Sequence, residues 1–142
     1  MKKISLIFAL IFAISSYYVQ AERGRIVQAQ KVVTLTPEQI LGLINQHNTG
    51  GISPELITLV FMPKYTVDAY VVVYETIDPS GKATYSSGTI CVPVGSTQTS
   101  PLVEYCHGTQ FMDIEAPSMF VSSESMIGIL FSMTGYVMVS PD

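Results

Sequence analysis

The sequence has little charge, two cysteines, two histidines and no tryptophan, and these shortages exclude several classes of protein. Charged residues make up 13% of the 142 residues and hydrophobic residues 48%, which excludes a disordered acidic or basic tail. The seven Lys and Arg residues are scattered and the net charge is −4, so the clustered basic face of a nucleic-acid-binding protein is absent. The length suits one domain and not two.

Several catalytic and metal-binding motifs are also missing from the sequence. There is no Gly-x-Ser-x-Gly, because Ser53 follows Gly51 but Glu55 stands where the second glycine belongs, so no serine nucleophile elbow is complete here. There is no HExxH, no CxxC and no glycine-rich phosphate loop. The only histidines, His47 and His107, argue against a histidine-based metal site. We therefore expect no metal and no organic cofactor.

The first 21 residues have the three parts of a secretory signal peptide. Two lysines in residues 1–3 precede an apolar core over residues 4–14, and small residues precede a break after Ala21. We expect cleavage after Ala21 and export to the periplasm or the medium. The alternative is a membrane anchor, since residues 4–21 carry no charge, but Ser15, Ser16 and Gln20 dilute that run. We expect no stable membrane span after the signal is removed.

Residues 22–64 are predicted to form an N-terminal helical extension. The polar residues 22–31 are expected to be a loose arm. Thr36 and Gln39 have the spacing of a capping box with Pro37 between them, so a helix should begin there and end before the Asn48–Gly51 stretch. A second short helix is predicted from Ser53 to about residue 60.

Residues 65–142 are predicted to form part of an α/β core. β-Branched and aromatic residues, turn residues and apolar spacing place strands at 69–76 and 83–94, a turn at 78–81, a strand at 101–106, a helix at 123–134 and a strand at 136–140. The first two strands should form an antiparallel hairpin, and the last two should be parallel strands joined by a right-handed crossover. Such a sheet is incomplete, so we expect the front part of a larger domain.

The turn His107-Gly108-Thr109 follows directly after the predicted strand at 101–106. A glycine at the carboxyl end of a buried parallel strand lets the backbone turn sharply and brings N–H groups into a crevice. Such N–H groups can stabilise the oxyanion that forms when an acyl group is attacked. The alternative is a plain tight turn after a strand, and the tripeptide alone does not separate the two.

Five stretches in this order resemble a known group of enzymes. They are Tyr70–Thr76, Ser87–Pro93, the turn His107-Gly108-Thr109, the segment Ala116-Pro117-Ser118, and Gly135–Asp142. Together they resemble the N-terminal half of secreted lipase/esterase-type α/β-hydrolases, including the secretory lipases, over residues 65–142. The resemblance implies the N-terminal portion of an α/β-hydrolase fold. In such proteins the Pro-Asp of this last stretch leads on to the nucleophile elbow, which this sequence lacks.

The resemblance also implies roles for matching residues. Thr109 would supply an oxyanion-hole N–H, with its hydroxyl as a second donor, while Gly108 would permit the turn and His107 would support it without being the triad histidine. Asp113 or Glu115 would lie beside the oxyanion hole, because some secretory lipases carry an acidic residue just before Ala-Pro-Ser. None of the triad Ser, acid and His is in this chain.

The two cysteines of an exported chain could form a disulfide, and the resemblance argues against it. In the usual α/β-hydrolase strand order, the strands that carry Cys91 and Cys106 flank the strand at 136–140. Two strand spacings are roughly 9–10 Å, whereas a disulfide needs Cα atoms within about 7 Å. We expect no disulfide between Cys91 and Cys106 and two free, buried thiols.

Two functions from different classes remain. The first is an exported serine hydrolase that acts on small-molecule or lipid carboxylic esters, with this chain as its N-terminal part and inactive alone. The second is a small exported non-catalytic module that binds a partner through an exposed sheet edge.

Overall fold

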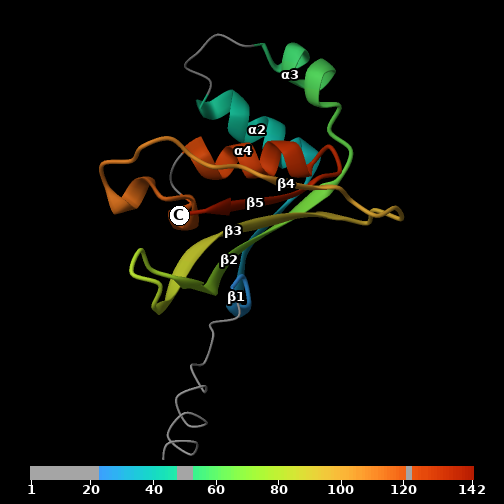
Figure 1. The fold of residues 1–142 in the computed structure, drawn as a ribbon. Coiled ribbons are helices and arrows are strands. Elements are labelled where there is room, and N and C mark those ends of the chain that lie inside the picture. The colour runs from blue at the N-terminus through green and yellow to red at the C-terminus, as the bar shows by residue number, and fades with distance from the viewer. Residues whose placement is uncertain (1–22, 48–52, 121–122) are drawn as a thin grey trace, which may run out of the picture.

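The computed structural model describes residues 23–47, 53–120 and 123–142 of the chain, as a five-stranded sheet with helices packed against it (Figure 1). The strand order is β1-β2-β3-β5-β4. The predicted signal peptide and its cleavage site lie outside the described residues. No helix in the described ranges has the length and apolar character needed to cross a membrane.

The centre of the sheet is the predicted antiparallel hairpin. Strand β2 runs over Thr66–Ile77 and strand β3 over Ala83–Val94, and their register has no shift from one end to the other. The turn between them is closed by Asp78, whose carboxylate accepts hydrogen bonds from the backbone N–H groups of Ser80 and Lys82, each at 2.9 Å. The hairpin prediction is confirmed.

Part of the predicted loose arm is instead a strand. Strand β1, Ile26–Leu35, pairs antiparallel with β2 along the edge of the sheet. Its side chains are exposed over most of its length, and only Val33 and Leu35 pack against the core, so the sequence carries little of the apolar alternation from which a strand is predicted. Arg25 forms an ion pair with Glu75, and the Lys31 Nζ lies 3.1 Å from an oxygen of Asp68. The segment 22–64 thus contains a strand as well as its helices.

The two predicted helices of this segment are present with their caps. Helix α2 spans Pro37–His47; Thr36 Oγ1 accepts from the Gln39 N–H at 3.3 Å, and Gln39 Oε1 accepts from the Thr36 N–H at 2.8 Å. Helix α3 spans Pro54–Phe61, and the Ser53 hydroxyl caps it by accepting from the Leu56 N–H. Reciprocal capping satisfies N–H groups that the first helical turn leaves unpaired.

The rest of the chain forms the predicted strand–helix–strand unit. Strand β4 (Leu102–Glu104) is followed by two short 3₁₀ helices, η1 (Asp113–Glu115) and η2 (Pro117–Met119), then by helix α4 (Ser123–Ser132) and strand β5 (Val137–Pro141). Strands β4 and β5 are parallel, and β5 pairs antiparallel with β3 on its other side. The sheet is therefore mixed, as the α/β prediction requires, and β4 is its second edge.

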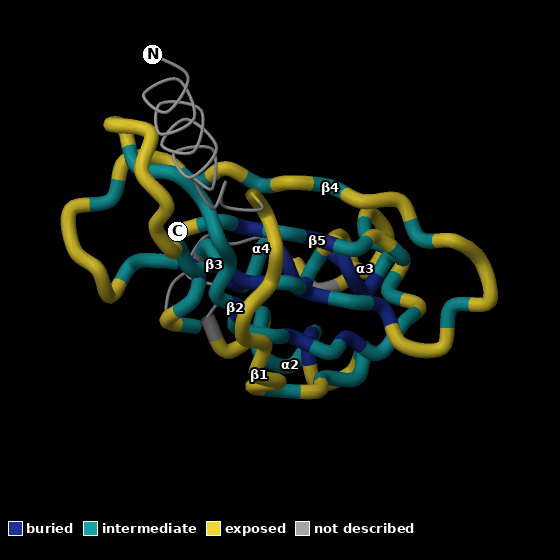
Figure 2. Tube along the Cα trace, turned by 60° about the horizontal axis from the view of Figure 1, so that its bottom comes forward, coloured by how far each residue is buried: buried dark blue, intermediate teal, exposed yellow. Residues whose placement is uncertain are grey.

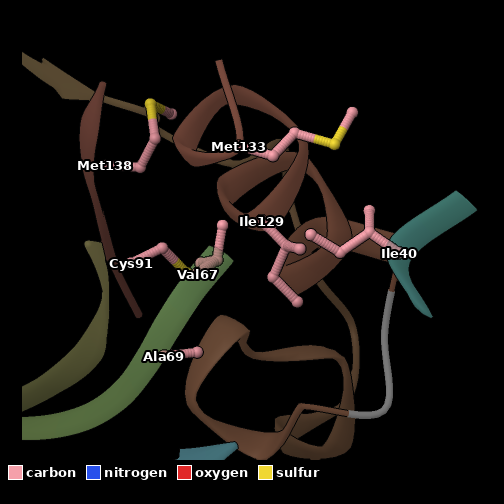
Figure 3. Packing of buried hydrophobic residues seen from close by; sticks show 7 residues of the cluster. All are labelled: Ile40, Val67, Ala69, Cys91, Ile129, Met133 and Met138. Atoms are coloured by element: carbon pink, nitrogen blue, oxygen red, sulfur yellow. The ribbon is translucent and has the colours of Figure 1, made fainter. Parts of the chain in front are cut away.

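Helices α2 and α4 lie on the same face of the sheet (Figure 1), and the core lies between. Its buried side chains come from both layers, as Figure 3 shows: Ile40, Val67, Ala69, Cys91, Ile129, Met133 and Met138. The buried Ser132 hydroxyl donates to the Cys91 carbonyl at 2.9 Å, which ties the end of α4 to β3. This packing fixes α4 and β5 relative to each other, and β5 in turn pairs with β4, from which the next loop leaves.

Candidate functional site

The carboxyl ends of β4 and β5 meet at one edge of the sheet because the two strands are parallel. The loop that leaves β4, residues 105–120, contains η1 and η2 and lies beside the end of β5, where the orange segment meets the C-terminal label in Figure 1. In open α/β sheets this edge is where ligands bind. The predicted site residues all lie on this loop.

Gly108 and Thr109 are exposed, and their backbone N–H groups donate to no acceptor within the described part of the chain. Two consecutive unpaired N–H groups beyond a parallel strand suit an anion or a polarised carbonyl oxygen. The turn does not depend on a glycine at position 108, however. Its φ is not in the left-handed region, and an added Cβ would meet nothing within 4 Å, so the turn does not require glycine.

His107 is half-buried, and its ring turns back onto its own loop. Its Nδ1 lies 2.6 Å from the Gly108 carbonyl oxygen. A carbonyl can only accept, so Nδ1 carries the proton and donates it. This contact holds the backbone directly before Thr109.

Asp113 and Glu115 were both predicted to lie beside the oxyanion hole, and Glu115 is the one that makes hydrogen bonds within the loop. Its carboxylate accepts hydrogen bonds from the backbone N–H groups of Phe111 at 3.0 Å and Met112 at 3.4 Å. Its carbonyl oxygen accepts from the Gln110 side chain at 2.7 Å. Asp113 is exposed at the start of η1, and its side chain has no hydrogen bond with another described residue. Glu115 therefore closes the loop on itself, immediately after Thr109.

Asp142, which was not predicted as a site residue, connects this loop to the sheet. Its Oδ1 accepts from the Ser118 backbone N–H at 2.9 Å, and its Oδ2 accepts from the Ser87 hydroxyl at 2.6 Å. Its own backbone N–H donates to the Ser87 carbonyl at 3.0 Å. The available signal was a carboxylate directly after a buried parallel strand, but its partners are 24 and 55 positions away in sequence.

The start of the loop is tied to α4. The Tyr105 hydroxyl donates to the Glu124 carboxylate at 2.5 Å, and this hydrogen bond to a nearby negative charge raises the pKa of Tyr105 above its ordinary value. The Tyr105 backbone N–H donates to the Val139 carbonyl at 2.9 Å, which continues the pairing of β4 with β5. The loop is thus held at both ends and across its middle.

The cysteines lie on either side of β5, as the strand order in the prediction requires, and both are free. Cys91 on β3 is buried, and burial raises the pKa of its thiol to about 12. The expectation of a second buried thiol is wrong, since Cys106 is exposed. Strand β4 lies at the edge of the sheet, where it is largely exposed (Figure 2), and it ends at Glu104, so Cys106 lies in the loop beyond it.

Metal ligands do not gather anywhere in the ranges that the structure describes: no group of three or more His, Cys, Asp or Glu residues there could hold an ion. What this edge offers a ligand is backbone N–H groups and exposed loop side chains. That set can bind and polarise an oxygen, but it contains no nucleophile paired with a base.

No family model and no curated protein matches the chain. Solved structures do. A protein of Legionella pneumophila with a provisional designation as a hydrolase superposes with a TM-score of 0.63 at 21% identity over 82% of this chain. LipA of Xanthomonas oryzae, a rice cell wall degrading esterase, superposes with a TM-score of 0.63 at 18% identity over 84% of this chain. The chain has part of an α/β-hydrolase fold.

The extent of these matches supports the prediction of an incomplete sheet. The chain spans 30% of the Legionella protein and 29% of LipA, and the N228W mutant of LipA gives the same share at 20% identity. At identities this low the likeness shows the esterase-like fold alone.

Proposed function

We propose that this chain is the oxyanion-binding part of an exported serine hydrolase that acts on carboxylic esters. The observation that carries the proposal is that Gly108 and Thr109 are exposed residues at the carboxyl edge of an α/β-hydrolase sheet, with backbone N–H groups that donate to no acceptor among the described residues. In this fold an oxyanion-hole donor comes from the loop after this kind of strand, and the matching residue here is Thr109.

The chemistry requires three further groups that these 142 residues do not supply: a serine nucleophile, a histidine base and a carboxylate that orients the histidine. A serine hydroxyl attacks the ester carbonyl carbon while a histidine takes its proton, and the carbonyl oxygen becomes an oxyanion. The Thr109 N–H donates to that oxyanion. The intermediate then breaks its bond to the alkoxide oxygen, which takes the proton from the histidine and leaves as the alcohol, and water releases the acid from the acyl-serine by the same steps. No metal or organic cofactor takes part.

The side chains around the site favour an ester with an apolar acyl group. Large hydrophobic residues on the loop are exposed: Phe111 (91%), Met112 (60%), Ile114 (54%) and Met119 (51%). An apolar surface beside the oxyanion donors fits a substrate whose carbonyl is polar and whose chain is not, in a small molecule or a lipid. Export through the predicted signal peptide, cleaved after Ala21, would bring the enzyme to such substrates outside the cytoplasm.

The decisive experiment removes the Thr109 N–H. In the complete protein, Thr109→Pro should lower kcat for p-nitrophenyl butyrate by about 10²–10³-fold, the usual cost of losing one oxyanion donor. Thr109→Ala keeps the N–H and separates it from the hydroxyl. Thr99→Pro is the matched control, since Thr99 is also exposed in a loop and its N–H also lacks a hydrogen bond among the described residues. Equal losses in Thr109→Pro and Thr99→Pro would contradict the proposal.

Two simpler measurements test the remaining parts. Residues 22–142 expressed alone should hydrolyse no short-chain aryl ester above background, because they lack the nucleophile and its base. Turnover that a serine-directed phosphonate abolishes would reveal a nucleophile within the chain and refute that part. The downstream reading frame should continue past Asp142 into a Gly-x-Ser-x-Gly, and sequencing of the mature N-terminus should begin at Glu22.

A second candidate is a non-catalytic module that binds a partner strand along the open edge of β4. The edge is accessible, and Leu102 on it is 68% exposed. A compact monomer of residues 22–142 with a cooperative thermal transition, and a stop codon directly after Asp142, would favour this function over the hydrolase.

A further inference from the structure

Asp142 has three hydrogen bonds at the point where β5 meets the loop. Its two carboxylate oxygens accept from two different segments, the Ser118 N–H on η2 and the Ser87 hydroxyl on β3. These two hydrogen bonds to the carboxylate are charge-assisted, and such bonds are roughly twice as strong as neutral ones. A carboxylate that bridges a loop and a strand in this way restrains the loop relative to the sheet.

A continuous set of contacts leads from this bridge to Thr109. Ser118 follows Pro117, which is buried, so η2 is seated on the sheet. Two residues before Pro117, the Glu115 carbonyl accepts from the Gln110 side chain at 2.7 Å. Gln110 is the covalent neighbour of Thr109. A displacement of η2 would therefore shift the backbone that presents the Thr109 N–H.

We propose that Asp142 is a positioning residue for the oxyanion-binding loop, acting through its bridge to Ser118 and Ser87. The proposal rests on the proposed function and goes beyond it, since it names the group that holds the donor in place. Oxyanion donors act only within a few tenths of an ångström of the correct position, and a misplacement of about 1 Å can cost 100-fold in rate.

The test compares two substitutions at this position in the complete protein. Asp142→Ala removes both acceptors but keeps the backbone bond to the Ser87 carbonyl, so the end of β5 stays paired. We expect kcat for p-nitrophenyl butyrate to fall about 10- to 100-fold, with KM changed less than about twofold because the donor acts in the transition state. Asp142→Asn should retain kcat within about threefold, since its Oδ1 still accepts from Ser118 and its amide can donate to Ser87 Oγ.

Asp78→Ala is the matched control. Asp78 also accepts from a serine and from backbone N–H groups, but at the hairpin turn between β2 and β3, and its loss should leave kcat unchanged. Hydrogen exchange at the Ser118 amide provides a second readout that is independent of activity. Exchange there should be at least about tenfold faster in Asp142→Ala and close to wild type in Asp142→Asn.

The outcomes separate this inference from the proposed function. If the wild type hydrolyses the ester and Asp142→Ala keeps its kcat, the positioning role is refuted while the proposed function stands. Equal kcat losses in Asp142→Ala and Asp142→Asn also refute the bridge. If the wild type hydrolyses no ester, the proposed function fails, and hydrogen exchange at Ser118 alone decides whether Asp142 anchors the loop.

Discussion

The β2–β3 hairpin and the loop after β4 are held in place by different kinds of interaction. Each hairpin strand has 12 residues, and backbone pairing runs along both of them without a shift. Strand β4 has three residues, and the loop beyond it is fixed by the side chains of Tyr105, Glu115 and Asp142. The hairpin uses its backbone N–H and carbonyl groups to pair its own two strands. The loop instead leaves the N–H groups of Gly108 and Thr109 without an acceptor among the described residues.

This difference explains where a site can form. An N–H group that pairs within a sheet is not available to a substrate, and a buried unpaired N–H is costly. The loop avoids both conditions, because carboxylates that accept from Phe111, Met112 and Ser118 hold its shape while Gly108 and Thr109 remain exposed residues. A short edge strand followed by a side-chain-anchored loop is therefore suited to presenting donors.

The largest expected contrast between the two regions is in thiol labelling. Cys91 lies in the hairpin and Cys106 in the loop. At pH 8 a thiol with a pKa of about 12 is only about 10⁻⁴ ionised, and its burial also blocks access. We expect a disulfide reagent to modify Cys106 at least about 10³-fold faster than Cys91. Peptide mass spectrometry assigns the sites, and full labelling in guanidinium is the control. Comparable rates would show that β3 opens as readily as the loop.

The next largest effect should come from the core under α4. Met138 on β5 is 2% exposed, and Met138→Ala should lower the free energy of unfolding by about 2–5 kcal/mol through lost burial and a cavity. Leu102→Ala, on the exposed edge strand β4, should change it by less than about 0.5 kcal/mol. Urea titration followed by far-UV circular dichroism suits a protein without tryptophan. Similar losses in the two variants would mean that β4 is as well packed as β5.

A smaller loss of stability is expected from a substitution at the contact between β3 of the hairpin and β5. A Cβ at Gly88 on β3 would lie 2.6 Å from the Ser140 carbonyl oxygen on β5, and a backbone atom cannot easily move away. Gly88→Ala should therefore destabilise by about 1–3 kcal/mol. Gly42→Ala inside α2 is the control, because its Cβ would meet nothing within 4 Å outside its own helix and should stabilise by about 0.5–1 kcal/mol. Two changes of the same sign would contradict the close approach of β3 and β5.

The smallest effect concerns the pH dependence of the outer strand β1. Hydrogen bonds from the Thr34 hydroxyl and then from Lys31 lower the pKa of Asp68 below its ordinary value. A carboxyl with a lowered folded pKa stabilises above its unfolded pKa of about 3.9, and that stabilisation is lost as pH falls through the folded value. Asp68→Asn should thus reduce the acid sensitivity of unfolding below about pH 4. Thr34→Val, which removes the hydroxyl donor but keeps the carboxylate, should reduce that sensitivity less than Asp68→Asn does.

Local patterns were enough to predict most elements. The capping box at Thr36 and Gln39, the serine cap at Ser53 and the turn at 78–81 are all contacts between residues two to four positions apart. The limits of the hairpin strand 83–94 follow from its turn and its β-branched residues in the same way. Strand β1 was missed because its side chains are exposed over most of its length, and only Val33 and Leu35 at its end are partly buried.

The same distinction between local and long-range contacts applies to the candidate site. The sequence by itself determined that a turn follows the strand predicted at 101–106, because strand propensity and turn residues are local properties. Only the tertiary structure decided that Asp142 bridges Ser118 and Ser87, that Glu115 closes the loop onto Phe111, and that Cys106 is exposed. These depend on which strands are neighbours, and the pairing of β5 with both β3 and β4 joins segments that are far apart in the chain.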